Sequence, residues 1–321
     1  MSPQLKKTLK LIVPIALGLF LVWYSYQSTS LEDRKTIVTS ITNANPFWIG
    51  VSILIGIISH IARAIRWNYL LKPLGYQPKL YNNVLIVFLS YFANLGIPRS
   101  GEVLRATALT TYENVPFEKG FGTIVTERVI DLIMLLLVIF TALLLQTNII
   151  LGYLNQSGMG IIIGLAVLVL GIVSLVIVIR ILKKSSSPFA KKINGFLNGL
   201  LDGITSILKM ENKWLFIFYT FLIWFCYVAM FWVIKFTVLE TADLSISQLL
   251  VAFVGGAFAM STTNGGIGLY PIAVSGSLSL FGVSAIAGNT FGWIMWIAQT
   301  LMVVVFGAIS FVLLPLLNRN R

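Results

Sequence analysis

The sequence predicts an all-α, polytopic membrane protein, and three observations lead to this fold class. Of the 321 residues, 57% are hydrophobic and 11% are charged, whereas a soluble domain has roughly 25% charged residues. The apolar residues gather in runs long enough to cross a bilayer, which takes about 20 residues in a helix. The 23 Lys and Arg outnumber the 11 Asp and Glu and stand mainly at the ends of these runs, where anionic lipid attracts them. We therefore expect one membrane domain over residues 1–321 and no nucleic-acid partner.

Six of the apolar runs are long enough for full transmembrane helices. The first follows a basic amino-terminal segment, as a signal peptide would. Its length and the missing small-residue cleavage site favour an uncleaved span instead. The six predicted spans cover residues 9–26, 46–67, 121–146, 160–182, 214–239 and 287–317.

Two further apolar stretches are interrupted by Gly and Pro. The first, 82–111, is broken at residues 94–98, Asn-Leu-Gly-Ile-Pro, and the second, 245–281, at residues 264–268, Asn-Gly-Gly-Ile-Gly. Residues 82–97 would make a helix of about 24 Å, which is short for a hydrocarbon core of about 30 Å. We therefore expect two broken or re-entrant helical hairpins.

The order span, broken hairpin, span occurs twice, over residues 46–146 and 214–317. The positive-inside rule places both termini in the cytoplasm, so the two copies run in opposite directions. Paired breaks in two halves are typical of inverted-repeat transporters and mark their binding site, although Gly and Pro also simply favour loops. The expected parts are a first span with its outer loop (1–45), a first repeat with an extra span (46–182), a cytoplasmic amphipathic connector (183–212) and a second repeat (213–321).

Charged residues within the apolar segments are concentrated in the first half, because residues 244–318 contain none. A charge inside a membrane is costly and marks a function or a compensating partner. Arginine binds phosphate through two parallel hydrogen bonds, so the arginines are candidates for binding an anionic lipid head group. The candidate head-group residues are Arg63, Arg66, Arg99, Glu102 and Arg105, and a charge network or coupling group is expected at Glu127, Arg128 and Asp131.

Two other interpretations of these charges stay open. The charges of the first hairpin and the following span can pair only to hold helices together. Arg63 and Arg66 can serve as anchors at the membrane surface. In the second hairpin, Asn264, Gly265, Gly266 and Gly268 offer open backbone for close approach to a ligand or to the first hairpin, or small residues for helix packing.

Three segments together resemble the lysylphosphatidylglycerol synthase transmembrane-region family, also called flippase-like integral membrane proteins. They are Arg-Ala-Ile-Arg-Trp-Asn-Tyr-Leu-Leu over 63–71, Asn-x-x-x-Pro-Arg-x-Gly-Glu-x-x-Arg over 94–105 and Glu-Arg-x-x-Asp over 127–131. The Gly-Gly-x-Gly of 265–268 resembles the family's late glycine-rich motif. It lacks the acidic residue that often follows there. In fused members the membrane region precedes a soluble domain that attaches an amino acid to phosphatidylglycerol. The resemblance therefore implies lipid translocation and argues against aminoacyl transfer by this chain.

The leading hypothesis is a translocase that flips an anionic or phosphate-bearing lipid across the bacterial inner membrane by alternating access. The partners expected are a phospholipid or polyprenyl-phosphate lipid and a lipid-modifying enzyme. One alternative is a lipid-head-group or polyprenyl-diphosphate phosphatase with Mg²⁺ held by Glu127 and Asp131. Another is a non-catalytic partner of a lipid synthase or glycosyltransferase. With one His and one Cys, multi-His and thiolate metal sites are excluded, and the leading hypothesis needs no metal or cofactor.

Overall fold

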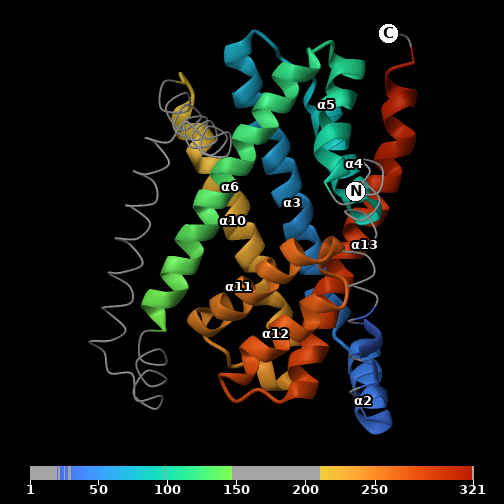
Figure 1. Cartoon of the computed structure of the whole chain (residues 1–321), viewed down its shortest axis with the longest axis vertical. Coiled ribbons are helices and arrows are strands. Elements are labelled where there is room, and N and C mark those ends of the chain that lie inside the picture. The colour runs from blue at the N-terminus through green and yellow to red at the C-terminus, as the bar shows by residue number, and fades with distance from the viewer. Residues whose placement is uncertain are drawn as a thin grey trace, which may run out of the picture. The chain divides into compact units, whose positions relative to one another are not determined.

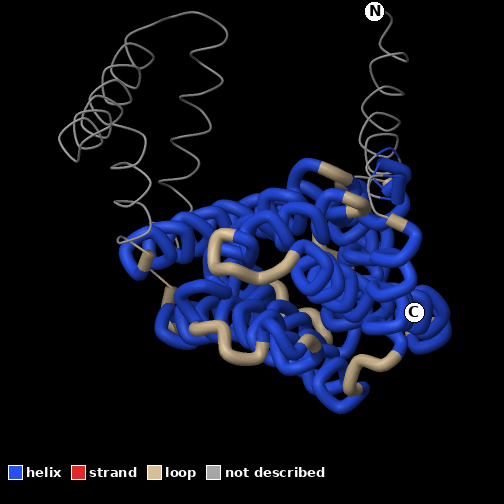
Figure 2. The backbone as a smooth tube through the Cα atoms, turned by 90° about the horizontal axis from the view of Figure 1, so that it is seen from below, coloured by secondary structure: helices blue, strands red, loops and turns tan. Residues whose placement is uncertain are grey.

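The structure is a computed structural model that describes residues 30–97, 99–146 and 210–319, with short pieces between 20 and 27. Within these ranges every regular element is helical, as Figure 2 shows. The predicted all-α class is therefore confirmed. The predicted connector helix and the span 160–182 lie outside the described residues, as does most of the span 9–26.

Four long apolar helices of the described part have the length and composition to cross a membrane. They correspond to four of the six predicted spans, and the shortest, with 22 residues, extends about 33 Å. The chain is thus a multi-pass membrane protein. The four are α3 (Pro46–Leu71), α6 (Phe117–Leu145), α10 (Lys213–Ile234) and α13 (Ala285–Leu317).

Each predicted break divides its apolar stretch into two short helices. In the first hairpin these are α4 (Leu80–Gly96) and α5 (Ser100–Glu113). In the second they are α11 (Ile246–Thr262) and α12 (Leu269–Ser279), with the single turn η4 (Asn264–Gly266) between them. In Figure 1 the two hairpins lie towards opposite ends of α3 and α13, α4 and α5 above and α11 and α12 below.

The two leading spans end alike. A one-turn 3₁₀ helix that starts with a lysine follows each of them, η1 (Lys72–Leu74) after α3 and η2 (Lys235–Thr237) after α10. A second such turn, η3 (Leu239–Thr241), follows η2. A helix not expected from the sequence, α2 (Leu31–Thr42), lies in the predicted outer loop. The hydroxyl of Ser30 begins it by accepting a hydrogen bond from the backbone N–H of Asp33 at 3.1 Å.

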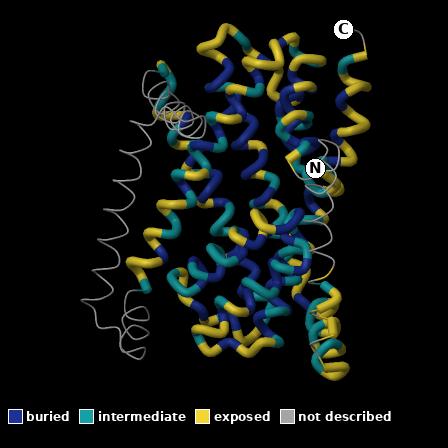
Figure 3. The backbone as a smooth tube through the Cα atoms, viewed as in Figure 1, coloured by how far each residue is buried: buried dark blue, intermediate teal, exposed yellow. Residues whose placement is uncertain are grey.

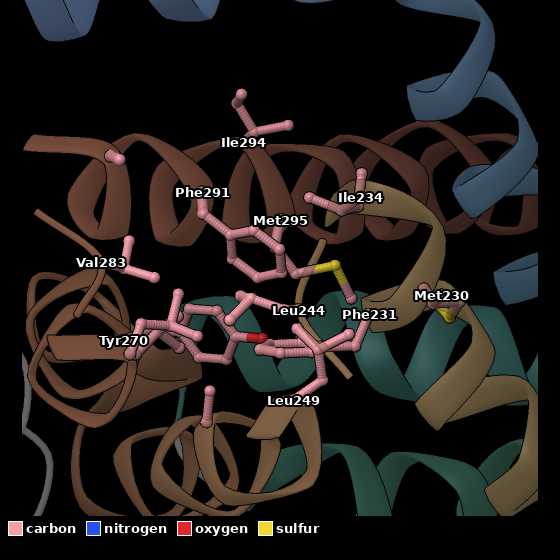
Figure 4. Close-up of a cluster of buried hydrophobic side chains, with 14 of the residues drawn as sticks. Met230, Phe231, Ile234, Leu244, Leu249, Tyr270, Val283, Phe291, Ile294 and Met295 are labelled. Carbon is pink, nitrogen blue, oxygen red and sulfur yellow. The ribbon is translucent and has the colours of Figure 1, made fainter. Parts of the chain in front are cut away.

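The chain divides into two compact units, residues 1–127 with 214–321, and residues 128–213. The larger unit contains both hairpins and its buried residues line the facing sides of its helices, as Figure 3 shows. Its apolar core lies among α10, α11, α12 and α13 (Figure 4), where Phe231 and Phe291 meet edge to face with ring centroids 4.8 Å apart. Since lipid tails are as apolar as these side chains, close packing rather than burial from water holds such helices together.

Small residues allow this close packing between α12 and α13. A Cβ atom on Gly292 would lie 2.6 Å from the Cα of Pro271, and one on Gly288 would lie 2.9 Å from the Cα of Ser275. Side chains larger than hydrogen at these two positions would push the helices apart. Small residues of α13 thus allow its close approach to α12.

Candidate functional site

Three arginines from two separate helices converge in the interior of the larger unit. Arg63 and Arg66 lie three residues apart on α3 and share one face, and Arg105 comes from α5. Their exposed fractions are 1%, 0% and 1%. Arg63 and Arg66 are therefore not anchors at a surface, and that interpretation is wrong.

The three guanidinium groups surround the carboxylate of Glu127 on α6, which is itself 0% exposed. Arg105 binds it through two hydrogen bonds, Nη1 to Oε1 at 3.1 Å and Nη2 to Oε2 at 2.9 Å. Arg63 donates to Oε1 as well, and Nη2 of Arg66 lies 3.5 Å from the same oxygen. Such a bidentate, charge-assisted pair is strong and fixes the geometry of both groups. We call these four residues the arginine cluster.

Two polar side chains of α10 hold the arginines of α3 from the other side. Nη2 of Arg63 donates to the hydroxyl of Tyr227 at 2.9 Å, and Nη1 of Arg66 donates to Oγ1 of Thr220 at 3.3 Å. Neither partner is among the residues predicted from the sequence. Because they stand seven residues apart, they share one face of an otherwise apolar helix, and this spacing was a usable signal.

Arg105 has its own support in an aromatic ring. Its guanidinium carbon lies 3.8 Å from the ring centroid of Trp67, a distance at which a cation is attracted to the ring face. The indole N–H of Trp67 donates to Oγ1 of Thr123 at 2.8 Å, which fixes the ring. A buried platform therefore holds Arg105 in place.

The start of α5 is packed closely against α4. The N–H of Gly101 donates to Oδ1 of Asn94 at 2.7 Å, and a Cβ on Gly101 would collide with the carbonyl oxygen of Ser90. Only glycine fits here, and the contact fixes the turn of helix that carries Arg105.

The other candidate charges are not members of the arginine cluster. Arg99 is exposed at the break of the first hairpin, with a left-handed φ of 62°. Glu102 is half-buried one turn before Arg105. Arg128 and Asp131 belong to the smaller unit, where Nη1 of Arg128 lies 3.7 Å from Oδ2 of Asp131.

The two breaks come into contact with each other. Nδ2 of Asn264 donates to the carbonyl oxygen of Leu95 at 2.5 Å. Gly265, Gly266 and Gly268 have φ values of 60°, 77° and 72°, which side chains rarely adopt. The indole N–H of Trp296 donates to the freed carbonyl of Gly265 at 2.7 Å. The glycines therefore allow an irregular backbone to lie against the first hairpin.

These features define a multi-pass membrane protein with broken helices and a buried charged cluster. Residues 11–317 match the model of the lysylphosphatidylglycerol synthase transmembrane region. The chain belongs to this family, in agreement with the resemblance noted from its motifs.

Three curated proteins of archaea are similar to parts of the chain. Glycosyltransferase AglD of Haloferax volcanii is 30% identical over 123 residues, which are 38% of this chain and 20% of AglD. The UPF0104 membrane protein MJ1595 of Methanocaldococcus jannaschii is 32% identical over 30% of this chain and 29% of its own length. A UPF0104 membrane protein of Methanothermobacter thermautotrophicus is 29% identical over 35% of this chain and 32% of its own length. The matches span a fifth to a third of these relatives. No solved structure matches the chain.

Proposed function

We propose that this protein moves a phosphate-bearing or otherwise anionic lipid between the two leaflets of a membrane by alternating access. The observation that carries the proposal is the arginine cluster. Three guanidinium groups are buried in a chain that has few charges, and charges inside a membrane protein mark substrate pathways. Membership of the family agrees with a role in lipid handling.

The position of the cluster favours transport over simple lipid binding. Arg105 lies on the helix that follows the first break, and the two breaks touch through Asn264 and Leu95. Broken helices of two inverted repeats form the substrate site in many transporters, and rocking of the repeats exposes it to either side. Exposed Arg99 is placed to meet a head group first, before it reaches Arg63, Arg66 and Arg105. Glu102, with Arg128 and Asp131, is proposed to orient these charges or to take part in coupling.

The proposed location is the plasma membrane of a prokaryote, with both termini in the cytoplasm. The orientation rests on the basic residues at the ends of the predicted spans. The bacterial inner membrane is the location that the sequence suggests, and the similar curated proteins come from archaea.

A flipping assay in vesicles tests the proposal. Purified protein is reconstituted with fluorescent phosphatidylglycerol, and the label in the outer leaflet is bleached chemically. Wild type should move the label at a rate well above that of empty vesicles. Arg105→Gln should flip the label at least about tenfold more slowly than wild type. The variant lacks the charged hydrogen bonds to the lipid, and each such bond contributes roughly 1.5–3 kcal/mol.

The matched control is Arg319→Gln, which removes an exposed arginine at the end of the chain and should leave the rate unchanged. If wild type moves none of a panel of anionic lipids, including a polyprenyl phosphate, the proposed function is wrong. If Arg105→Gln folds and flips as fast as wild type, the assignment of the site is wrong.

A second candidate is a non-catalytic partner of a lipid-linked glycosyltransferase, which the similarity to AglD favours. Stable co-purification with such an enzyme, and no flipping by the isolated protein, would support this candidate. The phosphatase alternative would use Glu127 and Asp131 to hold Mg²⁺, and the two hydrogen bonds from Arg105 to the carboxylate oxygens of Glu127 favour transport over it.

A further inference from the structure

Glu127 is held differently from the arginines around it. Each arginine has a second support that does not involve the carboxylate. Arg63 has Tyr227, Arg66 has Thr220 and Arg105 has the ring of Trp67. The carboxylate of Glu127, in contrast, is bound by the three arginines. The guanidinium groups therefore stay in place when the carboxylate leaves, whereas the carboxylate is held in place by the guanidinium groups.

A group that fits in place of the carboxylate has to match it in charge and shape. The ionised carboxylate presents two oxygens and one negative charge to Arg105. A phosphodiester also presents two unsubstituted oxygens and carries one negative charge, and arginine binds both groups through the same two-pronged geometry. If a phosphodiester replaces the carboxylate of Glu127 beside the arginines, the net charge of the buried cluster does not change. A phosphomonoester brings extra charge and does not satisfy this condition.

The site is closed in this structure, since all four members of the arginine cluster are buried. A lipid phosphate reaches the guanidinium groups only if the carboxylate withdraws. Glu127 lies on α6, whereas the arginines lie on α3 and α5, so a shift between these helices separates the two sides of the cluster.

We propose that Glu127 is an internal stand-in for the phosphodiester of the transported lipid: it occupies the arginines when the site is empty and gives way when a lipid enters. This inference rests on the proposed function and narrows its substrate class to lipids with a phosphodiester head group. The carboxylate has two effects on the lipid. It competes with binding, and by returning to the arginines it displaces the lipid into the second leaflet.

Removal of the competing charge should make the lipid bind more tightly. Purified protein in maltoside detergent, which contains no phosphate, is titrated with phosphatidylglycerol, and bound lipid is counted by native mass spectrometry. Glu127→Gln should bind phosphatidylglycerol at least about tenfold more tightly than wild type, because the arginines no longer hold an internal anion. In the flipping assay the same variant should be slower, because release lacks its competitor.

A charge-conserving variant covers the case in which Glu127→Gln does not fold. Glu127→Asp keeps the negative charge but is one methylene shorter, so it weakens the two contacts to Arg105. It should raise phosphatidylglycerol affinity by a smaller factor, about threefold. The matched control is Glu118→Gln, in which an exposed carboxylate of the same helix is changed, and its affinity should equal that of wild type.

Two results would overturn the inference. In the first, a folded Glu127→Gln or Glu127→Asp binds phosphatidylglycerol no better than wild type. In the second, phosphatidic acid, a phosphomonoester, gains as much affinity in these variants as phosphatidylglycerol does.

The flipping rate of wild type separates this inference from the proposed function. If wild type flips lipid but the variants show no gain in affinity, only the stand-in role of Glu127 fails. If the variants gain affinity but wild type flips nothing, the stand-in role holds for a lipid-binding protein and translocation fails.

Discussion

The interior around Glu127 and the interior around Met295 are built by helices in the same order but have opposite chemistry. Lys72 and Lys235 each begin the 3₁₀ turn that follows a leading span, so the two spans can be aligned on these lysines. In this alignment Arg63 of α3 matches Cys226 of α10, and Trp67 matches Met230. Arg63 and Cys226 each lie nine residues before the lysine of their own span (72 − 63 and 235 − 226), and Trp67 and Met230 each lie five residues before it (72 − 67 and 235 − 230).

The helices after the breaks can be matched in the same way. Arg105 and Val274 each lie five residues beyond the first residue of their helix (105 − 100 and 274 − 269). Glu127 and Met295 each lie ten residues beyond the first residue of theirs (127 − 117 and 295 − 285). Met230, Val274 and Met295 belong to the apolar core, in which Figure 4 labels Met230 and Met295. The positions matched to Arg105 and Glu127 therefore carry the packed apolar side chains of Val274 and Met295, and the position matched to Arg63 carries the buried thiol of Cys226.

This difference separates the scaffold from the site. Val274 and Met295 pack at these positions without charges, so close packing of the helices does not by itself require charges there. Replacing a buried ion pair with packed apolar residues is often neutral or stabilising. The charges of the first half are therefore better explained by a task than by stability, which agrees with the proposed lipid site.

The largest effect is expected when a charge is placed in the apolar half. Val274→Arg puts a guanidinium group at a fully buried position where Met230 and Met295 offer no ion pair. Such a group costs several kcal/mol. We expect loss of folded protein, measured as the monodisperse fraction after size-exclusion chromatography in detergent. Leu280→Arg, at an exposed position near the end of α12, is the control and should remain folded.

Truncation of the two matched positions should give a smaller and unequal effect. Arg105→Ala leaves Glu127 without its bidentate partner, and breaking a buried pair costs about 3–5 kcal/mol. Val274→Ala removes two methyl groups and should cost roughly 1–2 kcal/mol. Thermal denaturation in detergent compares the two variants directly. An equal loss of stability in both variants would show that Arg105 stabilises the protein only through its packing and not through its ion pair with Glu127.

Glycines in the second half allow a test of its packing without any charge. Gly292→Ala forces a Cβ to within 2.6 Å of the backbone of Pro271, and overpacking of this kind costs about 1–3 kcal/mol. Gly276→Ala on α12 meets nothing within 4 Å and should stabilise the helix by roughly 0.5–1 kcal/mol. Melting temperatures that shift in the same direction would contradict this account of the α12–α13 contact.

The sequence predicts the scaffold better than the site, and the reason is physical. Length and hydropathy act locally, so the four described spans and both broken hairpins follow from single segments. The arginine cluster depends on which faces of separate helices meet. Sequence spacing placed Glu102 beside Arg105 and Glu127 beside Asp131, each on one face. The sequence predicted that Arg63, Arg66 and Arg105 bind one anionic group, but not that the carboxylate of Glu127 fills that place, or that Arg99 remains exposed.

The smallest effect is expected at the contact between the two halves. Asn264→Ala removes the hydrogen bond to the carbonyl oxygen of Leu95, and a single neutral hydrogen bond contributes about 1 kcal/mol. If this contact holds the breaks together in one state of the transporter, its loss should shift the balance between states by up to about fivefold, and lipid affinity should change by no more than the same factor. The flipping rate and native-mass-spectrometry binding of the same preparation measure both quantities. Thr262→Ala, which changes an exposed hydroxyl two residues earlier, is the control. A loss of affinity much larger than fivefold would place Asn264 in the binding site and not in the contact between the halves.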